Sequence, residues 1–555
     1  MLSADLSAVG EPSLWAFGGA LALGVILIAA FLAMVTWNGL VTFWPKPIAM
    51  VELRDGTLLA GEPTRSSVYR PGENVLARLD EEQIAMIEAN GGFSERVLYK
   101  TANFDLYGDD FRWVSDFDKA AVTFPPDFHL FERQQWGTFV GRVAGLTIGG
   151  EPQAFDHALM QREQSAARRR FAEIRRLERS VIGAINQRMD RERLAIRRAN
   201  LRFGEDSPRA LEQIAASQAR IAELEAEFAE VQGRVNAIRE NDRRYRVLLE
   251  EVNGRTVDTE LSQIVRFYAA NDIGFFDKLG IYFSRWWEFL STEPREANTQ
   301  GGVLPAIFGT VAMTLLMVVF VAPFGVITAL YLREYAAQGR LTSIVRISVN
   351  NLAGVPSIVY GVFGLGFFAY TMGGSIDQLF FPENLPNPTF GKGGILWASL
   401  TLALLTVPVV IVASEEALAA VPRSMREGSL ACGASKWQTI RYVVLPKALP
   451  GIMTGMILAM ARGAGEVAPL MLVGVVKLAP ALPVDGFFPF LHLDRSFMHL
   501  GFHIFDVGFQ SRNSEAGKPM VFVTTLLLLA LIVTMNASAV TIRNRLKRKY
   551  AGGQF

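Results

Sequence analysis

The sequence predicts an all-α membrane protein with six transmembrane helices and a large external insert after the first helix. Half of the 555 residues are hydrophobic and only 20% are charged, whereas about a quarter of the residues in soluble proteins are charged. The mean hydropathy is +0.23. A membrane-spanning helix needs roughly 20 predominantly apolar residues. Six stretches qualify, at residues 14–40, 303–332, 344–370, 395–418, 451–476 and 521–540.

The charge and cysteine counts exclude several classes of protein. Lys and Arg number 55 against 54 Asp and Glu, which argues against a nucleic-acid-binding protein with a basic surface. One cysteine, Cys432, and five histidines exclude a disulfide framework and a cysteine zinc cluster. His499 and His503 have the spacing of metal ligands but lack a convincing third ligand, so we expect no metal site. No GxxxxGK[ST] motif is present to bind ATP phosphates.

Positive charges in the short loops predict the orientation in the membrane. Lys and Arg gather after the second span, after the fourth span and in the C-terminal tail, while the other short loops are poor in net positive charge. We therefore expect both termini in the cytoplasm and residues 46–300 outside. The first span lacks a basic segment before it and exceeds the apolar length of a signal peptide, so we expect an uncleaved anchor.

The external insert is predicted to contain a small β-rich module and a long helical hairpin. Strand-like segments surround an Asp55-Gly56 turn. Further on, apolar residues recur in heptads from Ile214 to Ile238, the pattern of a coiled coil, and turn residues at 204–208 precede them. A hairpin on the order of 60 Å long follows from the helical rise. The expected parts are an N-terminal helix (1–45), the β-rich module (46–150), the hairpin (151–260), an interfacial connector (261–300) and a membrane core (301–550).

Two short motifs in the insert bear on its surroundings. The charge run Arg168-Arg169-Arg170 is typical of a solvated coiled-coil face, and binding of phosphate or lipid headgroups is the alternative. Aromatic residues around Trp286 and Trp287 favour a helix that lies at the membrane interface.

The cytoplasmic loop at 415–450 is predicted to form two short helices that a partner protein can grip. Each helix begins with a Ser-x-x-Glu or Ser-x-x-Gln capping box. The first helix is expected to end at a glycine in the left-handed conformation, and the second at a Leu-Pro pair, because the residue before proline disfavours helix. In chain order the residues concerned are Ser424, Glu427, Gly433, Ser435, Gln438, Leu445 and Pro446.

This loop resembles the coupling helix of ABC importer permeases, whose pattern is E-A-A-x3-G-x9-I-x-L-P. The matching positions are Glu427-Gly428-Ser429, Gly433, Val443 and Leu445-Pro446, with small or conservative replacements at both alanines and at the isoleucine. The resemblance implies the type I ABC importer permease fold, with this loop docked in a cleft of an ATPase subunit.

Two more stretches, Asn350–Gly361 and Ala461–Leu470, resemble phosphate importer permeases of the Pst type, and the tail after Asn536 is similar to their A subunit rather than to the C paralogue. The resemblance covers about residues 300–549 and the first span, but not most of the insert. It implies a permease without enzymatic activity or a bound cofactor, which imports inorganic phosphate across the cell inner membrane. The implied partners are a C-type permease subunit in a heterodimer, a dimer of ATPase subunits that uses ATP and Mg²⁺, and a periplasmic phosphate-binding protein.

A pair of charges in the fifth predicted span is the candidate substrate site. Arg462 and Glu466 are four residues apart, and each charge at mid-bilayer costs about 2.5–3.5 kcal/mol, so both should face a bundle interior or a watery cavity. A guanidinium suits a phosphate oxyanion, with Glu466 holding Arg462 when no substrate is bound. A structural salt bridge is the alternative. Asn350, Asn351 and Ser357 add uncharged donors, and helix packing explains them equally well.

Two other functions are consistent with parts of the sequence. A transmembrane sensor is suggested by the anchor and the external hairpin, but only about 15 residues follow the last span, too few for a cytoplasmic output domain. A permease for another oxyanion, such as molybdate or sulfate, would have the same architecture, and only the two Pst-like stretches argue against it.

Overall fold

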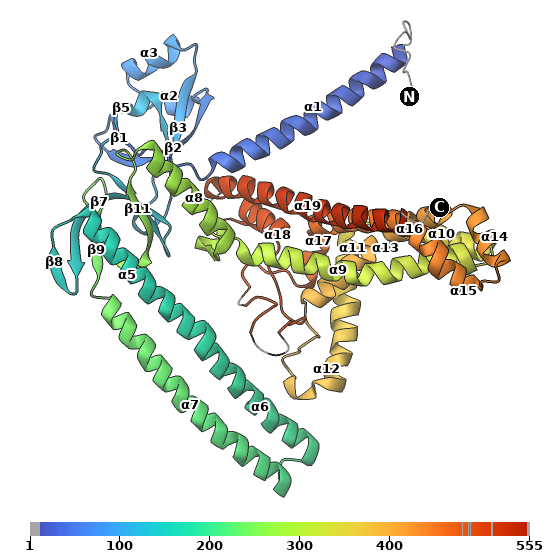
Figure 1. Cartoon of the computed structure of the whole chain (residues 1–555). Helices are drawn as coiled ribbons and strands as arrows, with labels where there is room; N and C mark the ends of the chain where they lie inside the picture. Colours follow the sequence, from blue (N-terminus) through green and yellow to red (C-terminus); the bar gives the residue numbers. More distant parts are fainter. Residues whose placement is uncertain (1–11, 480, 487, 489, 512–513, 552–555) are drawn as a thin grey trace.

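Six helices of the described residues are long and apolar enough to span a membrane, as the sequence predicts. The computed structural model (Figure 1) describes residues 12–479, 481–486, 488, 490–511 and 514–551. Four of the six helices are α1 (Pro12–Val41), α9 (Leu304–Leu330), α13 (Ile395–Ala419) and α19 (Ser514–Ala551). The other two are composite, with a π-helical stretch inside each: α11 (Ser357–Phe363) with α12 (Gly374–Phe380), and α15 (Lys436–Thr439) with α16 (Leu445–Gly465).

The third span begins later than predicted. The predicted helix at 344–370 is interrupted at residues 353–356, so that α10 (Arg340–Leu352) ends before the break and α11 begins after it. The residue before a proline is biased away from the α conformation, and Pro356 therefore separates the two helices. The span proper covers Ser357–Phe380.

The fifth span is shifted towards the N-terminus of the chain. It begins at Lys436 instead of residue 451 and runs through Leu445-Pro446, where we expected a helix to end. Pro446 directly follows the π-helical stretch Ile440–Val444 inside this helix, and a local π adjustment lets a membrane helix tolerate a proline. The span ends at Gly465 instead of residue 476, and a separate short helix, α17 (Ala468–Val473), follows.

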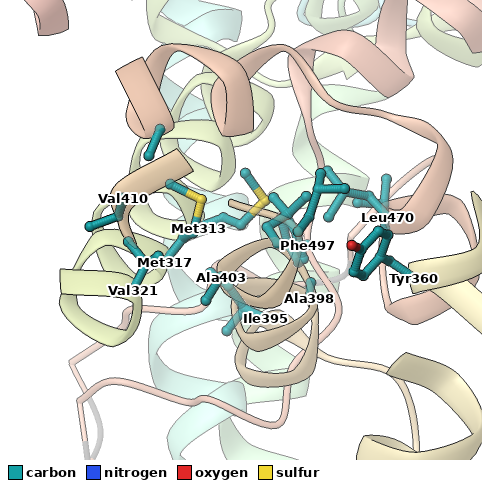
Figure 2. Packing of buried hydrophobic residues seen from close by; sticks show 14 residues of the cluster. Met313, Met317, Val321, Tyr360, Ile395, Ala398, Ala403, Val410, Leu470 and Phe497 are labelled. Atoms are coloured by element: carbon teal, nitrogen blue, oxygen red, sulfur yellow. The ribbon is translucent and has the colours of Figure 1, made fainter. Parts of the chain in front are cut away.

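Helices α9, α13 and α16 form the centre of the membrane part, where their apolar side chains pack in the cluster that Figure 2 shows. Two glycines permit close approach. A Cβ atom at Gly325 would lie 2.6 Å from Val410 Cγ1, and one at Gly463 would lie 2.5 Å from Met317 Sδ. Small residues at such crossings are typical of helix packing in membranes. Helix α1 contacts α19 at the periphery (Figure 1).

The insert begins with a five-stranded antiparallel sheet. Its strands lie in the order β4-β3-β2-β1-β5. The short helices that accompany it include α3, whose N-terminus carries a complete capping box between Asp80 and Gln83. The bounds are β1 (Ala49–Leu53), β2 (Leu58–Tyr69), α2 (Glu73–Leu76), α3 (Glu81–Ala89), β3 (Ser94–Lys100), α4 (Phe104–Tyr107), β4 (Phe111–Ser115) and β5 (Lys119–Thr123).

A second sheet closes the insert around an aromatic core. Phe131 pairs in register with Phe139 on one side and with Phe267 on the other, and all three rings are buried. The strand order is β10-β9-β7-β6-β11, with the short strand β8 on β7. The bounds are β6 (His129–Arg133), β7 (Thr138–Ile148), β8 (Glu151–Gln153), β9 (Arg246–Glu250), β10 (Thr256–Glu260) and β11 (Ile264–Ala269).

Strands β9 to β11 extend the β structure beyond the 46–150 segment that the sequence assigns to the β-rich module. They occupy residues that we placed in the hairpin and in the connector. An antiparallel helical hairpin returns the chain to the place where it left, so the segment after the hairpin can pair with β7 and β6. The sequences of β9, β10 and β11 gave no sign that these segments pair with β6 and β7, because strand pairing depends on the partner strand.

The helical hairpin consists of two long antiparallel arms. The first arm is α5 (His157–Arg176) and α6 (Gly183–Phe203), joined by a π-helical stretch, and the second is α7 (Pro208–Asp242). Val235 of α7 packs against Ile174 and Leu177 of the first arm, as the heptad pattern predicts for one face of α7. The knobs-into-holes packing of a true coiled coil stays a prediction.

The far end of the hairpin contacts the segment that follows the third span (Figure 1). The Arg198 guanidinium pairs with the Glu383 carboxylate at 2.6 Å, and Arg197 donates to the carbonyl groups of Glu383 and Leu385 at 3.2 Å. The hairpin is therefore attached to the membrane part at its tip as well as at its base.

Helix α8 (Phe275–Ser291) connects the second sheet to the membrane helices. Trp44, just after α1, contacts the rings of Phe275 and Tyr282, while Phe43 contacts Trp286. A helix is thus present at the expected place, and its position at the membrane interface stays a prediction. The remaining short elements are β12 (Pro294–Arg295), β13 (Gln300–Gly301), α14 (Arg423–Ala431) and α18 (Leu500–Phe505).

A buried carboxylate joins the second sheet to α8. Glu132 of β6 accepts hydrogen bonds from Arg285 of α8 at 2.6 and 2.8 Å, and Arg266 of β11 also contacts it. Arg285 donates further to the Phe43 carbonyl at 3.1 Å. Burial by itself would raise the pKa of Glu132, but the charges of Arg285 and Arg266 outweigh burial and lower the pKa to about 2.

We expect Glu132→Gln to destabilise the insert by roughly 3–5 kcal/mol, because the change leaves Arg285 buried without its counter-charge. The stabilisation is complete above the unfolded-state pKa of about 4.3 and is lost as the pH falls towards the folded-state pKa. Limited proteolysis of the purified full-length protein at increasing urea concentration monitors unfolding of the insert. It measures the difference in the free energy of unfolding between the parent and the variant.

The matched control is Glu95→Gln, since Glu95 is an exposed residue of β3. The difference in the free energy of unfolding between the parent and Glu132→Gln should become smaller below pH 4. Equal destabilisation by the two variants at pH 7 would show that the buried pair does not support the insert.

Candidate functional site

Two helix breaks lie against each other inside the membrane part. The break between α10 and α11 is spanned by Tyr360, whose hydroxyl donates to the Leu352 carbonyl at 2.6 Å. The break between α16 and α17 is adjacent, because a Cβ atom at Gly361 of α11 would lie 2.8 Å from the Cα of Pro469 in α17. Figure 2 shows Tyr360 beside Leu470 of α17. Backbone that departs from helix at membrane depth is tolerated where protein or a watery cavity surrounds it.

The predicted charge pair stands at the second break. Arg462 lies in the last turn of α16, and Glu466 is the extended residue just after it. The pair therefore straddles the helix end, which corrects our expectation of two residues on one continuous helix face. Arg462 Nε lies 3.6 Å from Glu466 Oε1, and 38% of the Arg462 side chain is exposed. A direct charge-assisted hydrogen bond is shorter, at about 2.7–2.9 Å, so this pair is loose and the guanidinium is accessible to another anion.

The three uncharged candidates flank the first break. Asn350 and Asn351 are exposed in the last turn of α10, and Ser357 is the half-buried first residue of α11. They lie on either side of the break rather than inside a continuous third span. Among the five predicted pathway residues, all of which the structure describes, the only ion pair or side-chain hydrogen bond is the one between Arg462 and Glu466.

The loop at residues 415–450 forms a tight turn at Gly433, as predicted. Gly433 has φ +86°, the left-handed conformation that favours glycine. Its N–H donates to the Leu430 carbonyl at 2.9 Å, and the Ala434 N–H donates to the Ser429 carbonyl at 3.2 Å. These two bonds form the Schellman motif, which satisfies the last carbonyl groups of α14.

Of the two predicted capping boxes, one is present and one is not. Ser435 and Gln438 form both bonds of a capping box at the start of α15. Helix α14 instead has Pro422 as its N-cap residue, without a side-chain cap bond. Ser424 is the second residue of this helix, one position after Arg423, so it lies too far inside to cap it. Glu427 is exposed on the same helix.

An arginine that the sequence analysis missed braces the loop. Arg426 of α14 donates to the carbonyl groups of Val421 and Leu418 at 2.8 and 2.6 Å, and its guanidinium lies 3.1 Å from the Glu334 carboxylate. Glu334 follows α9, 92 residues earlier in the chain, so no local pattern could have indicated the pair. The loop is thereby fastened to the C-terminal ends of α9 and α13.

The outer surface of the loop is partly apolar. The exposed side chains include Leu430, Cys432, Trp437 and Tyr442. Large exposed apolar side chains that gather on one surface are typical of a protein interface. The arrangement is a rigid, braced loop whose outer surface is suited to contact with another protein.

Comparisons with known proteins agree with this architecture. Residues 321–548 match the family described as the binding-protein-dependent transport system inner membrane component. The chain is 32% identical over 248 residues to the probable ABC transporter permease protein YqgH of Bacillus subtilis, a match that covers 43% of this chain and 76% of that protein. It is 33% identical over 261 residues to the phosphate transport system permease protein PstA 1 of Mycobacterium tuberculosis, covering 47% of this chain and 76% of the relative.

Solved structures with a similar chain include an inward-facing MetNI methionine ABC transporter, at 19% identity with a TM-score of 0.33, over 44% of this chain and 95% of the other. A bacterial ABC transporter for alginate import shows 15% identity with a TM-score of 0.33, over 47% of this chain and 84% of the other.

We expect Gly433→Val to open the loop, because a left-handed backbone costs a side-chain-bearing residue about 1–2 kcal/mol. No atom lies within 4 Å of a Cβ atom at this position, so the effect reports backbone strain alone. Tryptic cleavage at Arg423 or Arg426 in the purified protein should become several-fold faster, since proteolysis follows the population of the open form.

Gly428→Ala is the matched control. Gly428 lies inside α14, where a Cβ atom also meets nothing within 4 Å, and alanine favours helix. Cleavage of this variant should be no faster than in the parent. A cleavage rate in Gly433→Val equal to that of the control would contradict a structural role for the turn.

Proposed function

The chain belongs to the binding-protein-dependent transport system inner membrane components, and within them to the PstA-type permeases, and from this premise we propose that it imports inorganic phosphate. It is an ABC importer permease, a transport subunit rather than an enzyme. The observation that supports phosphate as the substrate is the exposed guanidinium of Arg462 at the paired helix breaks.

The transport site that we propose operates by exchange of ion-pair partners. With no substrate present, Glu466 holds Arg462 loosely at 3.6 Å. A phosphate oxyanion binds the guanidinium through two parallel N–H donors, which a planar fork provides and an ammonium does not. Ser357, Asn350 and Asn351 at the neighbouring break offer uncharged donors on the same route. Passage then depends on whether the two breaks are open to one side or the other.

The energy for transport comes, in this proposal, from ATP and Mg²⁺ used by a separate ATPase subunit. The braced loop with its exposed Trp437 and Tyr442 supports docking of such a subunit, through the turn at Gly433 and the flanking residues Ser424, Glu427, Ser435, Leu445 and Pro446. Loss of the copurified ATPase from Gly433→Val, but not from Gly428→Ala, would support docking. The other proposed partners are a C-type permease subunit and a periplasmic phosphate-binding protein that delivers the substrate.

The protein is a multi-pass membrane protein of the inner membrane. We propose that both termini lie in the cytoplasm and that residues 46–300 lie in the periplasm, since positive charges gather in the short loops of the cytoplasmic side. Long domains cross the membrane regardless of charge, so the arginines of the hairpin agree with this orientation.

The native cysteine makes this topology directly testable. Cys432 is exposed in the loop at residues 415–450, and Asp206 is exposed at the hairpin tip between α6 and α7. In intact cells a membrane-impermeant thiol reagent should label Asp206→Cys and leave Cys432 unlabelled. Cys432 should react after the inner membrane is opened. Labelling in the reverse order would overturn the proposed orientation.

Phosphate uptake by the reconstituted complex tests the substrate and the site together. Excess sulfate or molybdate should not reduce uptake of radiolabelled phosphate. Arg462→Lys should reduce uptake strongly because the fork is lost, and Arg462→Gln should reduce it further because Glu466 is left to repel phosphate. Competition by molybdate or sulfate as strong as by unlabelled phosphate would favour a permease for another oxyanion.

The double variant Arg462→Gln with Glu466→Gln separates transport from structure. If the pair only stabilises the fold, a neutral pair should restore assembly and much of the uptake, since no buried charge is left unpaired. If Arg462 binds substrate, the complex should assemble and stay inactive for phosphate. Uptake near the parent rate in the double variant would refute the proposed site.

A further inference from the structure

A cavity of about 1140 Å³ lies between α5, β11 and α8, outside the membrane helices. Helix α8 forms one wall and presents three different faces. The first face packs on the end of α1 through Tyr282 and Trp286. The second face is an exposed apolar stripe, and the third, which includes Ser284 and Glu288, lines the cavity. The stripe consists of Phe276, Phe283, Trp287 and Leu290.

The exposed stripe and the cavity meet along one edge. Phe276 and Trp287 belong to both, since they line the cavity and are 83% and 73% exposed. Helix α8 ends 13 residues before the spanning helix α9 begins and rests on the end of α1, so it lies at the level where the membrane meets water. Exposed Trp and Phe side chains on an amphipathic helix at this level insert into the boundary between headgroups and acyl chains.

The opposite wall of the cavity is a cationic face of α5. Arg168, Phe171 and Arg175 follow one another at helical spacing and all line the cavity. Arg175 is paired with Glu293 at 3.4 Å. Arg168 donates to the Val265 carbonyl, and none of the ion pairs among the described residues includes it.

Glu132 and Glu288, two carboxylates near the cavity, are already paired with other arginines, while Asp272 and Asp277 also line the cavity. Glu132 contacts Arg285 and Arg266, and Glu288 contacts Arg266 and Arg295. Burial, together with the neighbouring charge of Arg266, lowers the pKa of Arg168. Arg168 therefore has no ion-pair partner of its own among the described residues, and an anion that enters the partly enclosed site can contact its guanidinium.

We propose that this cavity binds an anionic phospholipid from the membrane leaflet on the side of the insert, with the lipid phosphate on Arg168 and the acyl chains along the stripe of α8. The planar guanidinium suits the two free oxygens of a phosphodiester. The apolar stripe continues from the cavity edge towards the bilayer, which a soluble anion would not require. The bound lipid holds the base of the hairpin on the membrane surface.

Native mass spectrometry of the purified full-length protein tests the proposal. Phosphatidylglycerol should bind more tightly than the zwitterionic phosphatidylethanolamine. Arg168→Glu should weaken phosphatidylglycerol binding on the order of tenfold, the effect of losing a charge-assisted hydrogen bond. Arg169→Glu is the matched control, because Arg169 is the exposed neighbour on α5 that does not line the cavity, and its binding should equal that of the parent.

Two more variants guard against effects of misfolding. Arg168→Lys keeps the positive charge without the fork and should bind with intermediate affinity. Trp287→Ser, on the exposed stripe, should weaken phosphatidylglycerol binding while tryptic cleavage of the insert stays unchanged. Equal binding by Arg168→Glu and Arg169→Glu, or equal binding of the two lipids, would overturn the proposal.

Displacement of the lipid by inorganic phosphate or glycerol phosphate at similar concentration would also overturn it, because the site would then recognise a soluble anion. The proposal would also be overturned if a partner subunit covers the stripe in the assembled complex, so that the lipid is lost on assembly. The measurement does not involve transport, so its result is independent of whether the chain carries phosphate.

Discussion

The structure of the insert depends on the pairing of Glu132 with Arg285 and Arg266. A buried carboxylate costs several kcal/mol unless opposite charges and hydrogen bonds surround it, and here the partners come from β11 and α8. Arg285 also reaches the Phe43 carbonyl at the end of α1. The same cluster thus holds the second sheet together and joins it to the first membrane span, so the insert and the membrane part meet in one defined arrangement.

From this junction the hairpin is attached to the membrane part at two places. In the middle of its first arm, Arg175 and Arg179 pair with Glu293, which precedes α9. Near its tip, Arg198 pairs with Glu383, which follows the third span. Ion pairs with exposed arginines contribute little individually, but these pairs lie at two separate places along one helical arm. A movement of the segment around Glu383 must therefore move the hairpin or break its tip contacts.

The proposed transport site lies where helices stop. The breaks at 353–356 and at Glu466 are adjacent because Gly361 allows α11 to touch Pro469, and the accessible Arg462 lies at this junction. In the loop at residues 415–450, the Schellman turn at Gly433 and the brace from Arg426 to Glu334 give the loop a fixed shape. A rigid loop can transmit a push from a partner to α13 and α16, to which it is directly connected.

The sequence by itself determined the features that depend on local spacing and composition: six apolar spans, the heptads of α7, the glycine turn at Gly433 and the capping box at Ser435. Hydrophobic length, helical period and capping chemistry act within a few residues. Tertiary structure alone decided where the third and fifth spans break, that β9–β11 return to the first strands of their sheet, and that Arg426 finds Glu334. It also placed Arg168, which has no ion-pair partner among the described residues, opposite the aromatic stripe of α8. These features join segments that are distant in the chain, and their energy depends on the partner each side chain meets only after folding.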